Sequence, residues 1–198
     1  WCSNQSWGHN VKLWKPLEGG KWQFLLGDLD RGFTGADSDD IASFTTPSEF
    51  GTAPSDFAKF WLKNIFENEA WAAYYTQRFN DHMYTTFHPD RVVHFIDKFR
   101  NGIEPEIAFH ADRWAGTTSS YGDGIVSQEF WEDQVATIYS FAQARPAIVM
   151  ADIQATFGMG GISNLGVSSM PSEGGMVRIN EFNVPDSPWS GPYFNDQP

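Results

Sequence analysis

The chain has one cysteine, few basic residues and no long apolar run, and each shortage excludes a class of protein. Cys2 is the only cysteine among 198 residues, which rules out an internal disulfide framework and a zinc site built from cysteines. Lys and Arg total 13 against 25 Asp and Glu, so the net charge of -12 disfavours nonspecific nucleic-acid binding. No apolar stretch approaches the roughly 20 residues of a membrane-spanning helix, so we expect no membrane-spanning segment.

The start of the chain lacks both an initiator methionine and a leader sequence. Its first residues, WCSNQSWGHN, contain neither a basic start nor an apolar stretch. They also begin inside what reads as a functional loop. We therefore expect the chain to be a piece of a longer protein, in which case a missing signal peptide says nothing about export.

A β-hairpin that ends in an acidic tip is the most informative segment that is present. A strand pattern follows Asn10, a turn rich in proline and glycine comes next, and the segment WQFLL returns. The pattern predicts a hairpin over residues 10–27, with Asp28 and Asp30 at its end. A strand end aims its side chains rigidly, and two carboxylates there provide hard oxygen ligands that suit Mg2+.

The order of parts around this tip is that of a protein kinase. Kinases place a catalytic-loop Asp, an Asn five residues later, a hairpin, and then a metal-binding Asp. In this chain the Asn corresponds to Asn10 and the metal-binding Asp corresponds to Asp28. The position five residues before Asn10 holds Gln5, where the catalytic Asp would be expected.

Helical periodicity replaces the strand pattern beyond the tip. Residues 31–54 are rich in Gly, Asp, Ser, Thr and Pro, which predicts one long loop at the place of a kinase activation segment. The later apolar spacing predicts helices over 55–66, 67–86, 89–102, 105–114 and 127–144, a loop over 119–124, and a last helix that follows a break at Arg145 and Pro146 and ends at Phe157.

The composition changes again at residues 158–161, where glycine accumulates. Beyond this point, residues 162–167 and 176–180 read as β-strands. We therefore predict an α+β fold, with one domain over residues 1–158 and the start of a small β module over residues 159–198.

Three long segments resemble the later part of a CotH kinase-family domain, an atypical kinase-like family typified by a bacterial spore coat protein. They are HNVKLWKPLEGGKWQFLLGDLDRGF, FHPDRVVHFIDKFRNGIEPEIAFHADRW and QEFWEDQVATIYSFAQARPAIVMADIQATF, and together they cover most of residues 4–158. The D-x-D step alone is a weak signal, whereas the ordered series is specific. The tail segments GGMVRIN and PWSGPYF resemble the opening of a β module that often follows this domain in secreted relatives.

The resemblance implies a protein-kinase-like C-lobe that transfers phosphate from ATP to protein side chains with Mg2+ or Mn2+. It assigns metal and nucleotide binding to Asp28, Asp30 and Asn10. It also implies a protein substrate, such as a surface or coat protein, and an extracellular or cell-surface location in a bacterium. The part of the domain that would cradle ATP is not in the chain, so we expect this fragment alone to be inactive. The oligomeric state is left open.

Gln5 departs from the family pattern, because an amide cannot accept the substrate hydroxyl proton as a carboxylate can. Two readings therefore stay open. The protein is an enzyme of the kinase type, degenerate at this position, or it is a non-catalytic pseudokinase or an extracellular binding or adhesion module.

Two further site candidates are disfavoured. A haloacid dehalogenase-type phosphatase also places two Asp at a strand end, but it needs an alternating α/β pattern downstream, and this chain is helical there. Glu106 and His110, one helical turn apart, read as a helix-stabilising pair, because no third metal ligand has a diagnostic spacing.

Overall fold

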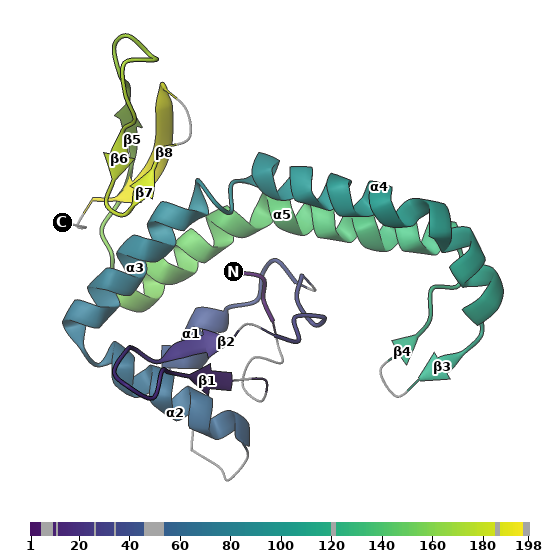
Figure 1. Cartoon of the computed structure of the whole chain (residues 1–198). Helices are drawn as coiled ribbons and strands as arrows, with labels where there is room; N and C mark the ends of the chain where they lie inside the picture. The colour runs from purple at the N-terminus through teal and green to yellow at the C-terminus, as the bar shows by residue number, and fades with distance from the viewer. Residues whose placement is uncertain are drawn as a thin grey trace.

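A computed structural model of the chain describes residues 1–4, 10, 12–25, 27–33, 35–45, 54–119, 122–184 and 187–195. About 50% of the chain is helical, and the strands form small antiparallel pairs, which confirms the α+β prediction. Figure 1 shows the two longest helices lying side by side, with a strand pair near the N-terminus and two more at the C-terminal end. None of the described helices is both long and apolar enough to cross a membrane.

The helices are α1 (Asp40–Thr45), α2 (Pro54–Phe66), α3 (Glu69–Met83), α4 (Pro89–Trp114) and α5 (Gln128–Phe157). The strands are β1 (Lys12–Trp14), β2 (Gln23–Leu25), β3 (Thr118–Ser119), β4 (Gly122–Asp123), β5 (Ile162–Val167), β6 (Arg178–Ile179), β7 (Phe182–Asn183) and β8 (Trp189–Phe194). The sequence predicted a loop over residues 119–124. The structure has the short β3–β4 pair there, which begins one residue earlier at Thr118.

Polar caps fix where two of the long helices begin. The Asn68 side chain accepts a hydrogen bond from the Trp71 N–H at 3.1 Å and starts α3. The Ser127 hydroxyl accepts from the Phe130 N–H at 3.0 Å and starts α5, as the sequence predicted. Such caps satisfy N–H groups that have no partner inside the helix. At the other end of α5, Gly158 adopts a left-handed φ of 62°, a conformation that glycine allows at low cost.

Two predicted helix breaks are wrong, because α4 and α5 each continue through a proline. α4 runs unbroken across Gly102 and Pro105, and α5 runs across Arg145 and Pro146. A proline inside a helix costs roughly 3 kcal/mol in local terms. The two helices offset that cost by packing on each other, where Ile107 of α4 is buried against Trp131 and Val135 of α5. Tertiary packing has overridden the local signal.

The predicted single loop over residues 31–54 is also wrong in part, because α1 lies inside it. The Asp39 carboxylate accepts a hydrogen bond from the Ala42 N–H at 2.9 Å, which satisfies one of the first N–H groups of α1. Ile41 of α1 is buried, with 5% of its surface exposed, in the main hydrophobic core described below. A six-residue helix is too short to show a periodic apolar pattern.

The main core lies where α1, α3, α5 and β8 meet. Its buried members are Ile41, Met83, Val149, Met150, Ile153 and Phe194. Trp1 packs beside this core, stacked on Phe87 with ring centroids 4.7 Å apart and edge-on to Phe141 at 5.6 Å. The first residues of the chain are therefore anchored in the interior of the fold.

The C-terminal strands lie beside α3. β5 pairs with β8 in an antiparallel register that sets Ile162 opposite Phe194, and β6 pairs with β7. The strand predicted over residues 162–167 matches β5, and β6 falls within the strand predicted over 176–180. Because Phe194 lies in the main core, the tail contacts the helical body directly. The domain boundary after residue 158 stays a prediction.

Candidate functional site

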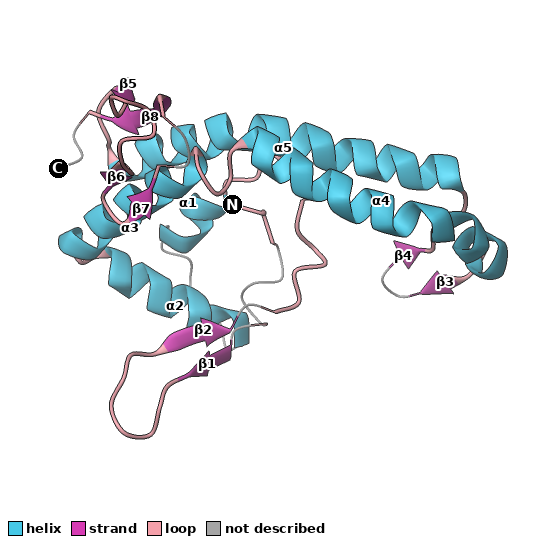
Figure 2. Ribbon diagram, turned by 45° about the horizontal axis from the view of Figure 1, so that its top comes forward, coloured by secondary structure: helices cyan, strands magenta, loops and turns pink. Residues whose placement is uncertain are grey.

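The β1–β2 hairpin carries the acidic tip, as the sequence predicted. Lys12 pairs with Leu25, Leu13 with Phe24 and Trp14 with Gln23, and Figure 2 shows the hairpin projecting beside α2. The chain leaves β2 and reaches Asp28, whose φ is 54°. Asp30 follows in a turn that closes when the Gly32 N–H donates to the Leu29 carbonyl at 3.0 Å. Both carboxylates are exposed.

Asn10 and Asp28 lie in direct contact. The Asn10 side-chain N–H donates to Asp28 Oδ2 at 2.6 Å, which joins the chain before the hairpin to the chain after it. The Asn4 side-chain N–H also donates to the Asp28 carbonyl oxygen, at 3.4 Å. The structure thus brings together two of the residues that the kinase-like order of parts selected, and it adds Asn4 as a neighbour.

The Asp28 backbone is in a conformation that residues other than glycine rarely adopt. A left-handed residue with a Cβ costs roughly 1–2 kcal/mol, and Asp and Asn tolerate it best. Such positions persist where the surroundings over-determine them, and they gather at functional sites. The contacts from Asn4 and Asn10 supply that determination at Asp28.

The oxygen donors at the tip fit a hard divalent cation. Mg2+ in phosphate-transfer sites is held by one or two carboxylates, while waters and substrate phosphates complete its octahedron. Asp28, Asp30 and the amide oxygen of Asn10 are donors of this kind. Across the part of the chain that the structure describes, no group of three or more His, Cys, Asp and Glu side chains gathers. A cation here would therefore need the amide, water or phosphate as further ligands.

Gln5 lies outside the described residues, so its direction relative to Asn10 and Asp28 stays a prediction. Glu106 and His110 are both exposed on α4.

The backbone around the tip is held by residues that sequence reasoning missed. The Cys2 carbonyl accepts a hydrogen bond from the Phe33 N–H at 2.7 Å, so the first residues run beside the chain that leaves the tip. Gly32 fits this close approach, since a Cβ there would lie 3.1 Å from the Cys2 carbonyl oxygen. Arg145, which the sequence placed at a helix break, is 1% exposed inside α5 and reaches the same segments. A charged side chain in an apolar helix was the available signal.

The hairpin also presents a large apolar surface next to the tip. Trp14, Trp22, Phe24 and Leu25 are exposed by 43%, 56%, 62% and 49%. The Lys15 ammonium lies 5.3 Å from the centroid of the Trp22 ring, close enough for a cation–π contact. This surface lies on the hairpin that precedes the candidate metal ligands in the chain.

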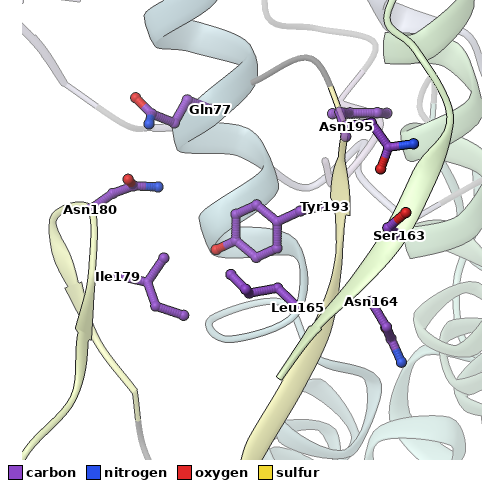
Figure 3. A pocket seen from close by; sticks show the side chains of 9 residues that line it. Gln77, Ser163, Asn164, Leu165, Ile179, Asn180, Tyr193 and Asn195 are labelled. Carbon is purple, nitrogen blue, oxygen red and sulfur yellow. The ribbon is translucent and has the colours of Figure 1, made fainter. Parts of the chain in front are cut away.

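A separate cavity of about 300 Å³ with a mixed polar and apolar lining lies where α3 meets the tail strands. Figure 3 shows Gln77 of α3, Asn180, Tyr193 and Asn195 around it, with Ile179 and Leu165 as its apolar wall. Behind it, buried Asp81 accepts hydrogen bonds from Tyr193 at 2.7 Å and Asn180 at 2.9 Å. Burial and then the bond to Asp81 raise the pKa of Tyr193. None of the lining residues belongs to the acidic tip.

Comparison with known proteins gives one match. A family model described as CotH kinase protein matches residues 2–149, which include the hairpin, the tip and most of the helical body. No curated protein and no solved structure matches the chain.

Proposed function

The chain belongs to the CotH kinase family, and from that premise we propose that it forms part of a kinase-like domain which transfers phosphate from ATP to protein side chains. In this proposal Asp28 is a ligand of the catalytic Mg2+ or Mn2+, and Asp30 and Asn10 are further ligands. The acceptor is a protein at a bacterial cell surface or in a coat, and the protein acts outside the cell. The same proposal assigns residues 1–158 to the kinase-like domain and residues 159–198 to a following β module.

The contact between Asn10 and Asp28 is the observation that carries the proposal. In kinases the catalytic-loop Asn and the Asp after the hairpin hold the metal ions together, which requires both side chains at one place. The 2.6 Å hydrogen bond puts the Asn10 and Asp28 side chains at one place, although they are 18 positions apart in the sequence. Local sequence around either residue does not by itself require the contact between Asn10 and Asp28.

The chain's own residues would contribute position and charge. Asp28 would hold the cation from a fixed backbone, and Asn10 would hold the Asp28 carboxylate while its amide oxygen faces the same ion. The bound metal would supply neutralisation of the developing phosphate charge. Phosphoryl transfer depends mainly on such positioning, because its transition state is loose and needs little covalent help.

Gln5 keeps a second candidate function open. A protein with the metal site but without a base would bind nucleotide and partner and turn over slowly or not at all, as a pseudokinase or adhesion module. General-base catalysis typically contributes about 10²–10⁴-fold, so Gln5→Asp should raise turnover within that range if the remaining site is intact.

The test is phosphate transfer from labelled ATP to a generic protein acceptor, measured with the full-length gene product. We expect Asp28→Asn to abolish transfer and to weaken Mn2+ binding, because the amide keeps the shape and removes the charge. Glu18→Gln, on the exposed hairpin turn, is the charge-matched control and should leave both unchanged. Equal transfer and equal Mn2+ affinity in Asp28→Asn and wild type would refute the metal role.

A further inference from the structure

Arg145 is one of the two most deeply buried charged residues among those that the structure describes, together with Asp81. It lies inside α5 with 1% of its surface exposed. Burying an ionised group is expensive unless hydrogen bonds and an opposite charge compensate it. Its environment should therefore show what the protein gains by keeping a guanidinium there.

Every nitrogen of the Arg145 guanidinium donates a hydrogen bond. Nε donates to the Trp1 carbonyl at 2.9 Å, and Nη1 donates to the carbonyls of Ala36 and Ser38 at 2.6 and 2.7 Å. Nη2 donates to Asp40 Oδ2 at 3.1 Å, which also supplies the opposite charge. The ring of Phe141 lies 5.7 Å from the guanidinium carbon and covers it.

These four acceptors belong to the two segments that flank the acidic tip. Trp1 begins the segment whose Asn4 donates to the Asp28 carbonyl, and whose Cys2 carbonyl accepts from the Phe33 N–H. Ala36 and Ser38 lie on the chain that leaves the tip and enters α1 at Asp40. One guanidinium on a long, rigid helix thus holds both segments at a fixed separation.

We propose that Arg145 is the positioning residue of the Asp28 site: it holds the entering and leaving segments so that Asn10 and Asp28 stay in contact. The inference rests on the proposed function for its catalytic meaning. Its geometric content stands on the four hydrogen bonds alone. The guanidinium suits this task because its donors diverge in one plane, whereas a lysine ammonium is a single point of charge.

The expected consequence is a loss of metal affinity without a loss of the fold. Changes to residues that orient a metal ligand typically lower metal affinity about 10–100-fold. Arg145→Lys keeps the positive charge but loses the planar set of diverging donors. We therefore expect it to lower the Mn2+ affinity about 10–100-fold. Asp40→Asn keeps the three carbonyl acceptors and removes the counter-charge and one of the two carboxylate acceptors, so its effect should be smaller.

Two readouts on the full-length gene product test the proposal, and one of them needs no metal. The first is the NMR signal of the Asn10 side-chain amide, assigned through Asn10→Asp and compared with Asp28→Asn, in which the acceptor carboxylate is gone. The second is Mn2+ affinity by electron paramagnetic resonance. Arg78→Lys is the matched control, because Arg78 pairs with Glu181 at 3.3 Å and joins α3 to the tail.

We expect Arg145→Lys to move the Asn10 amide signal most of the way to its position in Asp28→Asn, and Arg78→Lys to leave it in place. Circular dichroism confirms that each variant is folded; should Arg145→Lys not fold, Asp40→Asn decides by the same two readouts. An unchanged Asn10 signal in a folded Arg145→Lys or in Asp40→Asn overturns the proposal. If wild type binds no Mn2+ at the tip, the proposed function fails while the amide signal still decides the role of Arg145.

Discussion

At the scale of single residues, Asp28 combines an unfavourable backbone with an exposed carboxylate. A residue that only had to be solvated could relax to an ordinary φ and gain roughly 1–2 kcal/mol. Asp28 keeps a φ of 54° because Asn4 holds its carbonyl and Asn10 holds its carboxylate. The left-handed backbone of Asp28 therefore indicates that neighbouring residues fix the direction of its side chain.

Tyr75 gives a residue-scale prediction about pH. Burial, with a further contribution from Asp40, raises the pKa of Tyr75 to about 12, from 10 in the unfolded chain. The folded state then keeps its proton where the unfolded state loses it, so this stabilisation is complete below pH 10 and is lost as the pH rises towards 12. Between pH 8 and pH 11 the loss should be roughly 1 kcal/mol, and Tyr75→Phe should be spared it.

The measurement is the free energy of unfolding in urea at several pH values from 8 to 11. Tyr74→Phe is the control, since Tyr74 is its neighbour in α3 and is 44% exposed. Burial also raises the pKa of Tyr193, so wild type and both variants share an alkaline loss from that residue. Identical pH slopes in Tyr75→Phe and Tyr74→Phe would show that Tyr75 does not contribute.

At the scale of elements, the pairing of α4 with α5 predicts very different costs for two isoleucines one helical turn apart. Ile107 is 3% exposed against Trp131 and Val135, whereas Ile103 is 51% exposed. Ile107→Ala should lower the free energy of unfolding by about 2–5 kcal/mol, because it leaves a cavity. Ile103→Ala should cost less than about 1 kcal/mol, since exposed sites tolerate substitution. Urea unfolding measures both, and equal costs would contradict the packing.

Sequence patterns predicted the elements whose signals are local. The hairpin, the start of a helix at Ser127 and the end of a helix at Phe157 all depend on a few adjacent residues, and the structure confirms them. The continuous helices through Pro105 and Pro146 could not be predicted, because the energy that keeps them unbroken comes from tertiary packing, which includes the α4–α5 cluster around Ile107 and the main core around Val149. α1 was hidden for the opposite reason, since its six residues carry too little pattern.

The residues of the candidate site likewise include some that the sequence could predict and some that it could not. The order of Asn, hairpin and Asp along the chain was enough to select Asn10 and Asp28, because it follows the sequence of a known catalytic arrangement. Arg145 acts on residues more than 100 positions away, such as Ala36 and Asp40, and no spacing rule reaches that far. Pro146, the residue after Arg145, also led to the prediction of a helix break, and the structure shows a continuous helix there.

At the scale of the whole molecule, the tail and the helical body share polar contacts as well as core. Asn80 donates to the Pro192 carbonyl at 2.9 Å, and Asp81 accepts from Asn180 and Tyr193. Both α3 residues are 1% exposed, so separating their partners while the two parts stay packed would leave buried polar groups without partners. Such groups cost about 1–3 kcal/mol each when unsatisfied. A module boundary after residue 158 would therefore divide the chain by sequence while the two parts still unfold together.

Phe194 provides the test of that coupling. It is 3% exposed in a core otherwise built from α1, α3 and α5, and its cross-strand partner Ile162 is 43% exposed. Phe194→Ala should lower the stability of the helical body by about 3–5 kcal/mol, and Ile162→Ala should change it little. Hydrogen exchange of the α5 amides measures this directly, because a tail that folds independently would leave their protection unchanged. Loss of protection in α5, in parallel with loss in β5 and β8, would show that the residues after 158 complete the core that holds Arg145 in place.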